Sequence, residues 1–338
     1  NETVNQMLLE TLGNKTLRDA ATLVARETGL KRSDVYRQAL KLRENIINTD
    51  INFIEGDISS NKTYDLLRND YDCVFHLAAI SSLPFCENNK SLTMKYNVQG
   101  TLMLIEYCRK KGINNFCFGG TSAVYENNID KVFTEDLSVH PDLIYPLSKK
   151  FCEDILQSYV KNYNMSITIL RFFNIFGPNQ DIDRSNPPLL NYLIREYSSN
   201  RIPILHSDGT QSRDYVYVKD LIPLFINIIN KPSNEVFNVC TGKLLSVNNI
   251  LSIVSNYFGQ DISKTIWNNP KNLWDNHSEL FEGEHSLDKN RVAKETLKYS
   301  LGDNSKIFNY YGWKPQTNFD ELITETIEDS LKILKRKN

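Results

Sequence analysis

Tyr145 and Lys149 are the residues of this chain whose types and spacing best suit acid–base chemistry. Residues four apart on a helix lie side by side, so a helix at this point would bring the phenol next to the ammonium group. The positive charge favours the phenolate and is expected to lower the pKa of the tyrosine. The pair therefore predicts a tyrosine that acts as a general base.

The spacing alone does not select this pair, because the sequence contains it three more times. The other pairs are Tyr107 with Lys111, Tyr215 with Lys219, and Tyr310 with Lys314. A pattern that recurs this often has to be judged by its structural context.

The first pair has that context, because it stands between two apolar runs. Residues 116–118 lead into Gly-Gly-Thr-Ser at 119–122, and residues 167–170 form the second run. Strand, helix and strand in this order are typical of an open parallel α/β sheet. We predict that Thr121, Tyr145 and Lys149 converge and that the tyrosines of the other pairs lie outside their pocket. A surface helix with a solvated tyrosine is the alternative interpretation.

Composition restricts the class of protein. The chain has 338 residues, 41% of them hydrophobic and 24% charged, with a net charge of -2. These values are typical of a soluble globular protein of one or two domains, and they argue against wholesale binding to nucleic acid or membrane. No apolar run is long enough to span a bilayer and no signal peptide is recognisable, so a cytoplasmic location is expected. The six cysteines are scattered without metal-ligand spacing, so we expect no metal site.

Residues 1–46 have the apolar spacing of helices and predict a helical appendage. Eight Lys or Arg stand against three Asp or Glu between residues 14 and 43. Residues 17–40 resemble the C-terminal tail of bacterial ribosomal-RNA ribose methyltransferases, which implies a possible contact with RNA. A helical bundle with a solvated basic face is the other interpretation.

From residue 51 onward the chain resembles the extended short-chain dehydrogenase/reductase family, in particular its nucleotide-sugar 4-epimerases. Eight segments carry the resemblance in the family's order: Gly56-Asp57-Ile58, His76-Leu77-Ala78-Ala79, Asn97 with Gly100-Thr101, 121–125, 145–149, 171–178, 212–216 and 238–242. They extend over about four fifths of the chain.

The resemblance implies NAD as cofactor and a UDP-sugar as substrate. Tyr145 would be the base, with Thr121 and Ser122 bound to the sugar hydroxyl. The residues implied in cofactor binding are Asp57, Ile58, Ala78, Ala79, Asn97, Tyr145, Lys149 and Phe172. Asn174 and Arg213 would hold the substrate, and a homodimer would form through helices at 91–111 and 145–162.

Three of these residues have a second interpretation from the sequence itself. Asp57 follows an expected strand at 51–54 and is also an ordinary helix N-cap. Asn97 lies in a predicted helix and is equally compatible with an exposed position. Arg213 is next to Asp214 and near Asp220, so a structural salt bridge competes with diphosphate binding.

The family's opening strand, glycine-rich turn and helix have no counterpart in this sequence. Only Gly13, Gly29 and Gly56 precede residue 100, and no Gly-x-x-Gly-x-x-Gly occurs. The predicted fold is a Rossmann-like parallel sheet without its first β-α-β unit at 51–176, followed by a smaller substrate lobe at 177–338.

Two functions follow from this mixture: an NAD-dependent UDP-sugar 4-epimerase, or a non-catalytic descendant that binds a sugar nucleotide or RNA. The related 4,6-dehydratases are disfavoured, because they place Asp-Glu after the catalytic threonine and this chain has Ser122-Ala123. Since a glycine turn at a helix amino end is the usual pyrophosphate site, we expect the chain to purify without NAD and without epimerase activity.

Overall fold

The structure is a computed structural model that describes residues 2–12, 17–32, 34–35, 38–39, 52–68, 70–128, 132–182, 184 and 186–335. The chain divides into two compact units, Asn1–Gly56 and Asp57–Asn338.

The first unit is helical over most of its described length. Helix α1 spans Glu2–Leu12 and α2 spans Leu17–Thr28. Val4 and Leu8 of α1 form one small core with Ala21 and Val24 of α2 and with Val35 and Ala39 further along the chain. The helices expected before residue 29 are therefore present, whereas residues 40–51 lie outside the described residues.

The strand expected at 51–54 is wrong over its described part. Residues 52–56 take no regular secondary structure, and the side chain of Phe53 is 84% exposed. A strand is stabilised by pairing with a neighbour, and alternating apolar residues do not form one alone.

The second unit is built on a four-stranded parallel sheet in the order β1-β2-β3-β7. The strands are Val74–His76, Asn115–Thr121, Ser166–Phe172 and Val236–Val239. Thr121 pairs with Phe172, and Phe172 with Val239, so the strands end at one edge. Among the described residues β1 is an outer strand. The predicted α/β class with a Rossmann-like sheet is confirmed.

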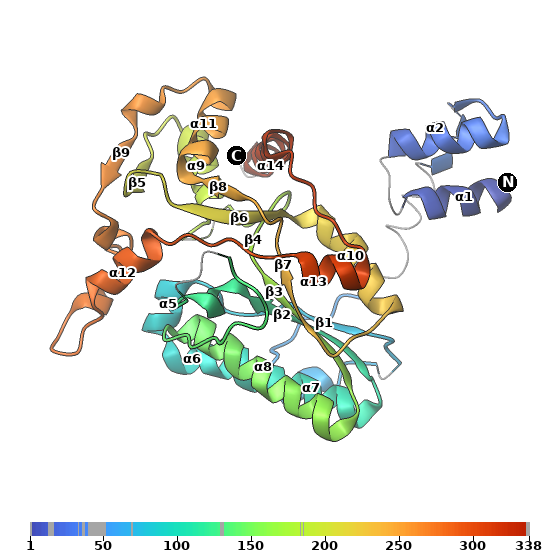
Figure 1. The fold of residues 1–338 in the computed structure, drawn as a ribbon, viewed down its shortest axis with the longest axis horizontal. Coiled ribbons are helices and arrows are strands. Elements are labelled where there is room, and N and C mark those ends of the chain that lie inside the picture. The colour runs from blue at the N-terminus through green and yellow to red at the C-terminus, as the bar shows by residue number, and fades with distance from the viewer. Residues whose placement is uncertain are drawn as a thin grey trace. The chain divides into compact units, whose positions relative to one another are not determined.

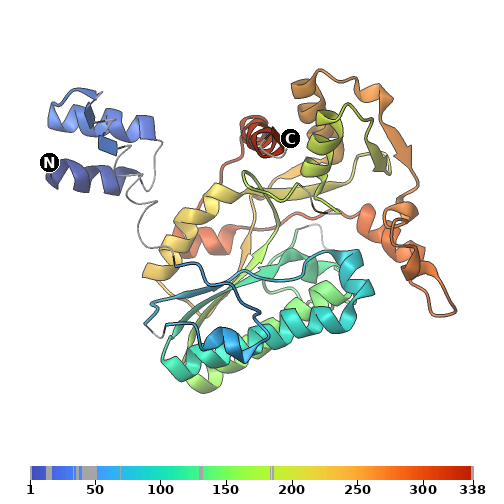
Figure 2. The same ribbon diagram turned by 180° about the vertical axis from the view of Figure 1, so that it is seen from behind.

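Helices cover both faces of this sheet (Figures 1 and 2). Helices α7 (Gly100–Lys111) and α8 (Ile144–Tyr163) pack on one face, against Phe116 and Phe118. Helices α10 (Leu221–Asn230) and α13 (Ser305–Tyr311) pack on the other, where Cys117 and Leu170 point. Alternate residues of a strand face opposite sides, so one apolar run serves two cores.

The helix predicted at 91–111 contains a wider turn in its middle. Helix α6 (Lys90–Met94) continues through a π-helical turn at Lys95–Gln99 into α7, which ends at Gly112 with φ 72°. A left-handed residue at a helix end favours glycine. The π turn contains Asn97, and such turns are frequent at functional sites.

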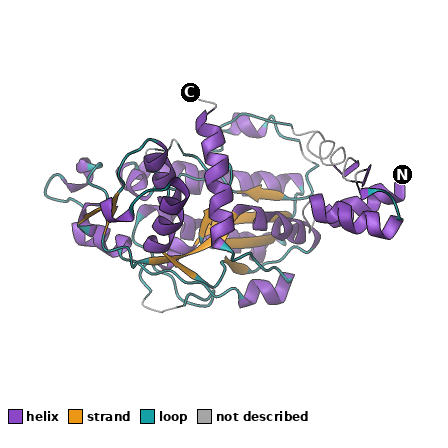
Figure 3. Cartoon of the chain, turned by 90° about the horizontal axis from the view of Figure 1, so that it is seen from above, coloured by secondary structure: helices purple, strands orange, loops and turns teal. Residues whose placement is uncertain are grey.

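The second unit contains further strands and helices besides the parallel sheet and the helices that cover it; Figure 3 draws helices in purple and strands in orange. A second sheet has the order β4-β6-β8, with strands Asn174–Phe176, Ser212–Tyr217 and Leu244–Ser246. β5 (Ile204–His206) pairs with β9 (Ile266–Asn268). The helices are α9 (Leu189–Ser198), α11 (Val247–Phe258), α12 (Lys289–Thr296) and α14 (Phe319–Lys335), and the short helices are α4 (Asn61–Tyr64) and α5 (Leu83–Asn88). No helix of the described residues is long and apolar enough to cross a membrane.

A buried ion pair fastens α8 to the sheet. Arg171 donates from Nε and Nη2 to the two carboxylate oxygens of Glu153, at 3.0 and 2.8 Å. Its Nη1 donates to the Tyr125 hydroxyl at 2.8 Å, and that hydroxyl donates to Asn238 at 2.9 Å. The carboxylate is 1% exposed and the guanidinium 5%, so neither charge has water as a substitute partner.

We predict that Glu153→Ala lowers the free energy of unfolding by about 3 to 5 kcal/mol, because it leaves the Arg171 charge buried without a partner. Chemical denaturation measures the change. Asp70→Ala is the control, since the Arg68–Asp70 pair is exposed and screened by water, and it is expected to have little effect. Equal losses in the two variants would contradict this account.

Candidate functional site

A cavity of about 1720 Å³ opens at the carboxyl ends of the parallel strands. This edge of an open α/β sheet is where ligands usually bind. Seven of the residues implied by the sequence line it: Ala79, Thr121, Tyr145, Lys149, Phe172, Asn174 and Arg213. The predicted convergence of Thr121, Tyr145 and Lys149 is thus present in the fold.

The end of β2 is shaped by glycines that let the neighbouring strands approach. A Cβ on Gly119 would lie 3.2 Å from the Leu77 side chain, and one on Gly120 would lie 3.1 Å from the Leu170 carbonyl oxygen. Thr121 then ends the strand and caps a 3-10 helix at Ser122–Tyr125, its Oγ1 accepting from the Ala123 amide at 3.1 Å. The hydroxyl is thereby held at the edge of the cavity.

Tyr145 lies in the first turn of α8, and the Thr121 side chain is near enough to its phenol to act on its pKa. Burial raises the pKa of the phenol, while the Thr121 side chain and the charge of Arg184 act in the opposite direction. The lowered pKa expected from the sequence is therefore wrong for this structure, because desolvation of the phenolate is the largest effect.

Lys149 is buried one helical turn further along and lies above the ring of Phe118, with Nζ 4.4 Å from the ring centroid. Burial lowers the pKa of its ammonium group to about 8. A buried cation that faces a cavity suits a ligand rich in oxygen, because such a ligand restores the solvation lost on folding.

Asn97 supports the site without lining the cavity. Its side chain accepts from the Ile80 amide at 2.8 Å and donates to the Ile80 carbonyl and to Ser148 Oγ, both at 3.0 Å. The residue is buried, so the exposed-helix interpretation is wrong. It joins the segment after β1 to the turn of α8 that carries Lys149.

On the opposite wall, Asn174 and Arg213 come from the second sheet. Asn174 Nδ2 donates to the Asp214 carbonyl at 3.0 Å, and Arg213 Nη2 donates to the Glu295 carbonyl at 2.8 Å. The Asp214 carboxylate accepts from Thr241 and Gly242, and that of Asp220 accepts from Gln316. No ion pair of Arg213 with either aspartate occurs in the described part of the chain, and burial lowers the pKa of its guanidinium.

Besides Asn97, four implied residues do not line the cavity. Asp57 is exposed and accepts from the amide and hydroxyl of Ser59 at 2.8 and 2.7 Å, as a residue in an ordinary turn does. Ile58 packs against Gly100, while Ala78 is exposed and Ser122 lies in the 3-10 helix. Their roles toward cofactor or substrate stay predictions.

The prediction that the tyrosines of the other three pairs lie outside the pocket of Tyr145 is correct for two of them. Tyr107 donates to the Arg68 carbonyl and Tyr310 packs against Phe237, and neither lines the cavity. Tyr215 does line it, so its predicted exclusion is wrong. β6 pairs in parallel with β4, and this register places Tyr215 opposite Asn174 at the same edge.

Sequence reasoning missed several residues of the cavity wall. Arg184 belongs to the loop after β4, and its charge acts on Tyr145. Trp274, Glu295 and Thr296 come from the last third of the chain. For Arg184 the sequence offered one signal, its position soon after Gly177-Pro178. No spacing in the sequence connected Trp274, Glu295 or Thr296 to Tyr145.

Comparison with known proteins identifies the family. The chain belongs to the NAD dependent epimerase/dehydratase family, whose model matches residues 11–240.

Its relatives include epimerases and dehydratases. It is 28% identical to a provisionally assigned UDP-glucose 4-epimerase of Methanocaldococcus jannaschii over 84% of this chain and 85% of that protein. It is 26% identical to human dTDP-D-glucose 4,6-dehydratase over 87% of this chain and 79% of that protein. The crystal structure of Thermotoga maritima UDP-glucose 4-epimerase with UDP-glucose superimposes with a TM-score of 0.73 at 26% identity, covering 85% and 86%.

The burial of Lys149 predicts a stability that depends on pH. Below pH 8 the group is charged in both folded and unfolded chains, and the full cost of burying the ammonium is present. Between about 8 and the ordinary value of 10.5 only the unfolded chain binds the proton, so stability rises with pH.

We therefore expect the free energy of unfolding of the wild type to rise, relative to that of Lys149→Met, by up to about 3 kcal/mol between pH 7.5 and 10. The rise corresponds to about 1.4 kcal/mol for each unit by which the pKa is shifted. Urea denaturation at a series of pH values measures the difference. Lys161→Met, an exposed lysine of the same helix, should follow the wild type. Parallel curves for wild type and Lys149→Met would disprove the assignment.

Proposed function

We propose that this chain interconverts UDP-sugars that differ in configuration at C4, with NAD as the hydride carrier. The observation that carries the proposal is the meeting of Thr121, Tyr145 and Lys149 in one cavity, with Arg213 on its far wall. Family membership and the likeness to UDP-glucose 4-epimerases support the substrate class. Ser122-Ala123 after Thr121 supports epimerisation over dehydration.

In this proposal the residues of α8 and β2 act on the sugar 4-hydroxyl. Thr121 and Tyr145 hold its oxygen between them, and Tyr145 takes the proton as the carbon is oxidised and returns it at the end. NAD, held by Lys149, Ala79 and Phe172, would supply the hydride-transfer chemistry at C4. Arg213 and Asn174 hold the UDP part, because a planar guanidinium pairs well with a diphosphate.

The residues present fit one end of the cofactor. Lys149, Ala79 and Phe172 would hold the nicotinamide and its ribose, since they combine a buried cation with an apolar wall. For the pyrophosphate, the described residues offer no strand, glycine turn and helix beside β1. Each lost charge-assisted hydrogen bond costs about 1.5 to 3 kcal/mol, so two or three weaken binding by about two to six orders of magnitude.

The second candidate is a non-catalytic binder of sugar nucleotides. Within the described residues β1 pairs with β2 alone, and the sequence has no Gly-x-x-Gly-x-x-Gly; both observations favour it. RNA binding by the first unit is a separate proposal, supported by the exposed side chains of Arg26, Lys31 and Arg32.

We expect the purified protein to release no nicotinamide nucleotide on denaturation and to show no epimerase activity as purified. Turnover of UDP-glucose is expected only when NAD is added in large excess. Tyr145→Phe should lower that turnover by about 10²- to 10⁴-fold, the usual contribution of a general base, while calorimetry shows unchanged binding of UDP. Binding of UDP-glucose without turnover at any NAD concentration would favour the second candidate. Near-stoichiometric NAD in the purified protein would show that another segment supplies the phosphate site.

A homodimer through α6, α7 and α8 is supported by apolar side chains on their surfaces. Leu92, Leu102 and Phe151 are 38%, 42% and 43% exposed. We expect Phe151→Glu to convert the dimer to a monomer in light scattering after gel filtration. Phe308→Glu, at an equally exposed phenylalanine on α13, is expected to leave it dimeric. A wild type that is already monomeric would refute the proposal.

A further inference from the structure

Two buried carboxylates hold the start of α8. Glu126 Oε1 accepts from the amides of Asp142 and Leu143, the latter at 2.9 Å, and Glu87 Oε1 accepts from the Ile144 amide at 2.6 Å. The first amides of a helix have no partner within the helix, and a carboxylate there is stabilised by the helix dipole. These three amides immediately precede Tyr145, so the two carboxylates fix where its turn begins.

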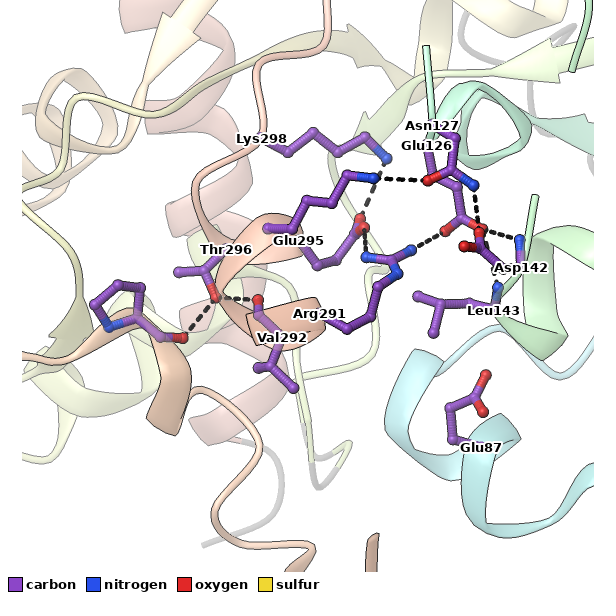
Figure 4. A network of polar contacts seen from close by, with 12 residues as sticks. Glu87, Glu126, Asn127, Asp142, Leu143, Arg291, Val292, Glu295, Thr296 and Lys298 are labelled. Atoms are coloured by element: carbon purple, nitrogen blue, oxygen red, sulfur yellow. Dashed lines mark hydrogen bonds and ion pairs between the residues drawn. The ribbon is translucent and has the colours of Figure 1, made fainter. Parts of the chain in front are cut away.

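An arginine from α12 joins this support to another element (Figure 4). Arg291 pairs through Nη2 with the outer oxygen of Glu126 and through Nη1 with Glu295 at 3.3 Å. Lys298 also pairs with Glu295, at 3.2 Å. The three side chains of the Glu126, Arg291 and Glu295 triad are 1%, 14% and 13% exposed, so water screens these charges little.

Helix α12 is itself part of the cavity wall. Glu295 and Thr296 line the cavity, and the Glu295 carbonyl accepts from Arg213. Thr296 Oγ1 donates to the Pro270 carbonyl at 2.9 Å, which holds the end of the helix in place. A continuous set of polar contacts thus leads from Arg213 through Glu295 and Arg291 to Glu126.

We propose that Glu126 is a positioning residue for Tyr145, because it binds the amides that precede this residue. Arg291 links Glu126 to α12, so the position of α12 affects how firmly Glu126 binds these amides. An anion bound at Arg213 therefore tightens the first turn of α8. The energetic reason is that Arg213 holds the end of α12 through the Glu295 carbonyl, at 2.8 Å, and a guanidinium has further N–H groups for an anion. An anion that fixes the Arg213 side chain therefore also fixes the helix that carries Glu295 and Arg291. Coupling of this kind is reciprocal and amounts typically to a factor of about 5 to 150. The catalytic consequence rests on the proposed function, whereas the coupling itself does not.

The test compares Glu126→Gln, Arg291→Met and Arg291→Lys with the wild type. Glutamine keeps an oxygen for the two amides and removes the charge that faces Arg291, while lysine keeps a positive charge at position 291. Glu106→Gln is the matched control, because Glu106 pairs with Arg109 at 2.7 Å on α7, outside the triad.

The first readout needs no turnover. Amide hydrogen exchange of residues 142–145 is followed with and without saturating UDP. We expect UDP to slow exchange about tenfold in the wild type and in Glu106→Gln, to have no effect in Arg291→Met and Glu126→Gln, and to keep part of its effect in Arg291→Lys. A purely structural role would raise exchange in the variants and leave the response to UDP intact, which would overturn the proposal.

The second readout is kinetic, at saturating NAD and UDP-glucose. We expect kcat to fall about 10- to 100-fold in Glu126→Gln and Arg291→Met, with the Kd of UDP changed less than threefold, and to recover to within about fivefold in Arg291→Lys. A kcat within twofold of the wild type in all variants would overturn the positioning role. A wild type that responds to UDP in exchange but has no turnover would refute the proposed function and leave the coupling in place.

Discussion

The position of α8 depends on one buried interaction, the two-bonded pairing of Glu153 with Arg171. A guanidinium and a carboxylate that are both removed from water are stable only when each satisfies the other. This requirement fixes the rotation of α8 on β3, and the rotation decides which side chains of the helix face the strand ends. Tyr145 and Lys149 are on the same helix, so they follow from it. Two further contacts restrict the position of the start of α8. Asn97 binds Ser148, and Glu126 binds the amides before Tyr145.

The electrostatic character of the cavity follows from burial. Lys149 and Arg213 both have a lowered pKa because their charges have lost water, and the buried phenol of Tyr145 has a raised one. A diphosphate near Arg213 would add negative charge to that of Glu295 and offset the loss of water around the guanidinium. The same reasoning explains why the phenol of Tyr145 does not have the lowered pKa that the sequence predicts. The Thr121 side chain lies near the phenol of Tyr145, whose ionisation depends on what else enters the cavity.

The sequence predicted those parts of the fold that depend on local patterns. The apolar runs at 116–118 and 167–170 became buried strands because their residues serve cores on both faces. Tyr145 was placed correctly at a helix start. The strand predicted at 51–54 is absent from its described part, because a strand needs a partner strand and the local sequence does not show whether one is present. Tyr215 was misplaced because the register between β4 and β6 is a tertiary property. Glu295 and Arg291 could not be connected to Tyr145, since residues more than a hundred positions apart in the sequence leave no spacing signal.

A crystal structure of the protein with UDP-glucose and NAD would test the arrangement of this cavity most directly. We expect the sugar O4 to lie within hydrogen-bonding distance of both the Tyr145 hydroxyl and Thr121 Oγ1, with the diphosphate on Arg213. A UDP-glucose whose sugar points away from Tyr145, or which binds outside this cavity, would contradict it.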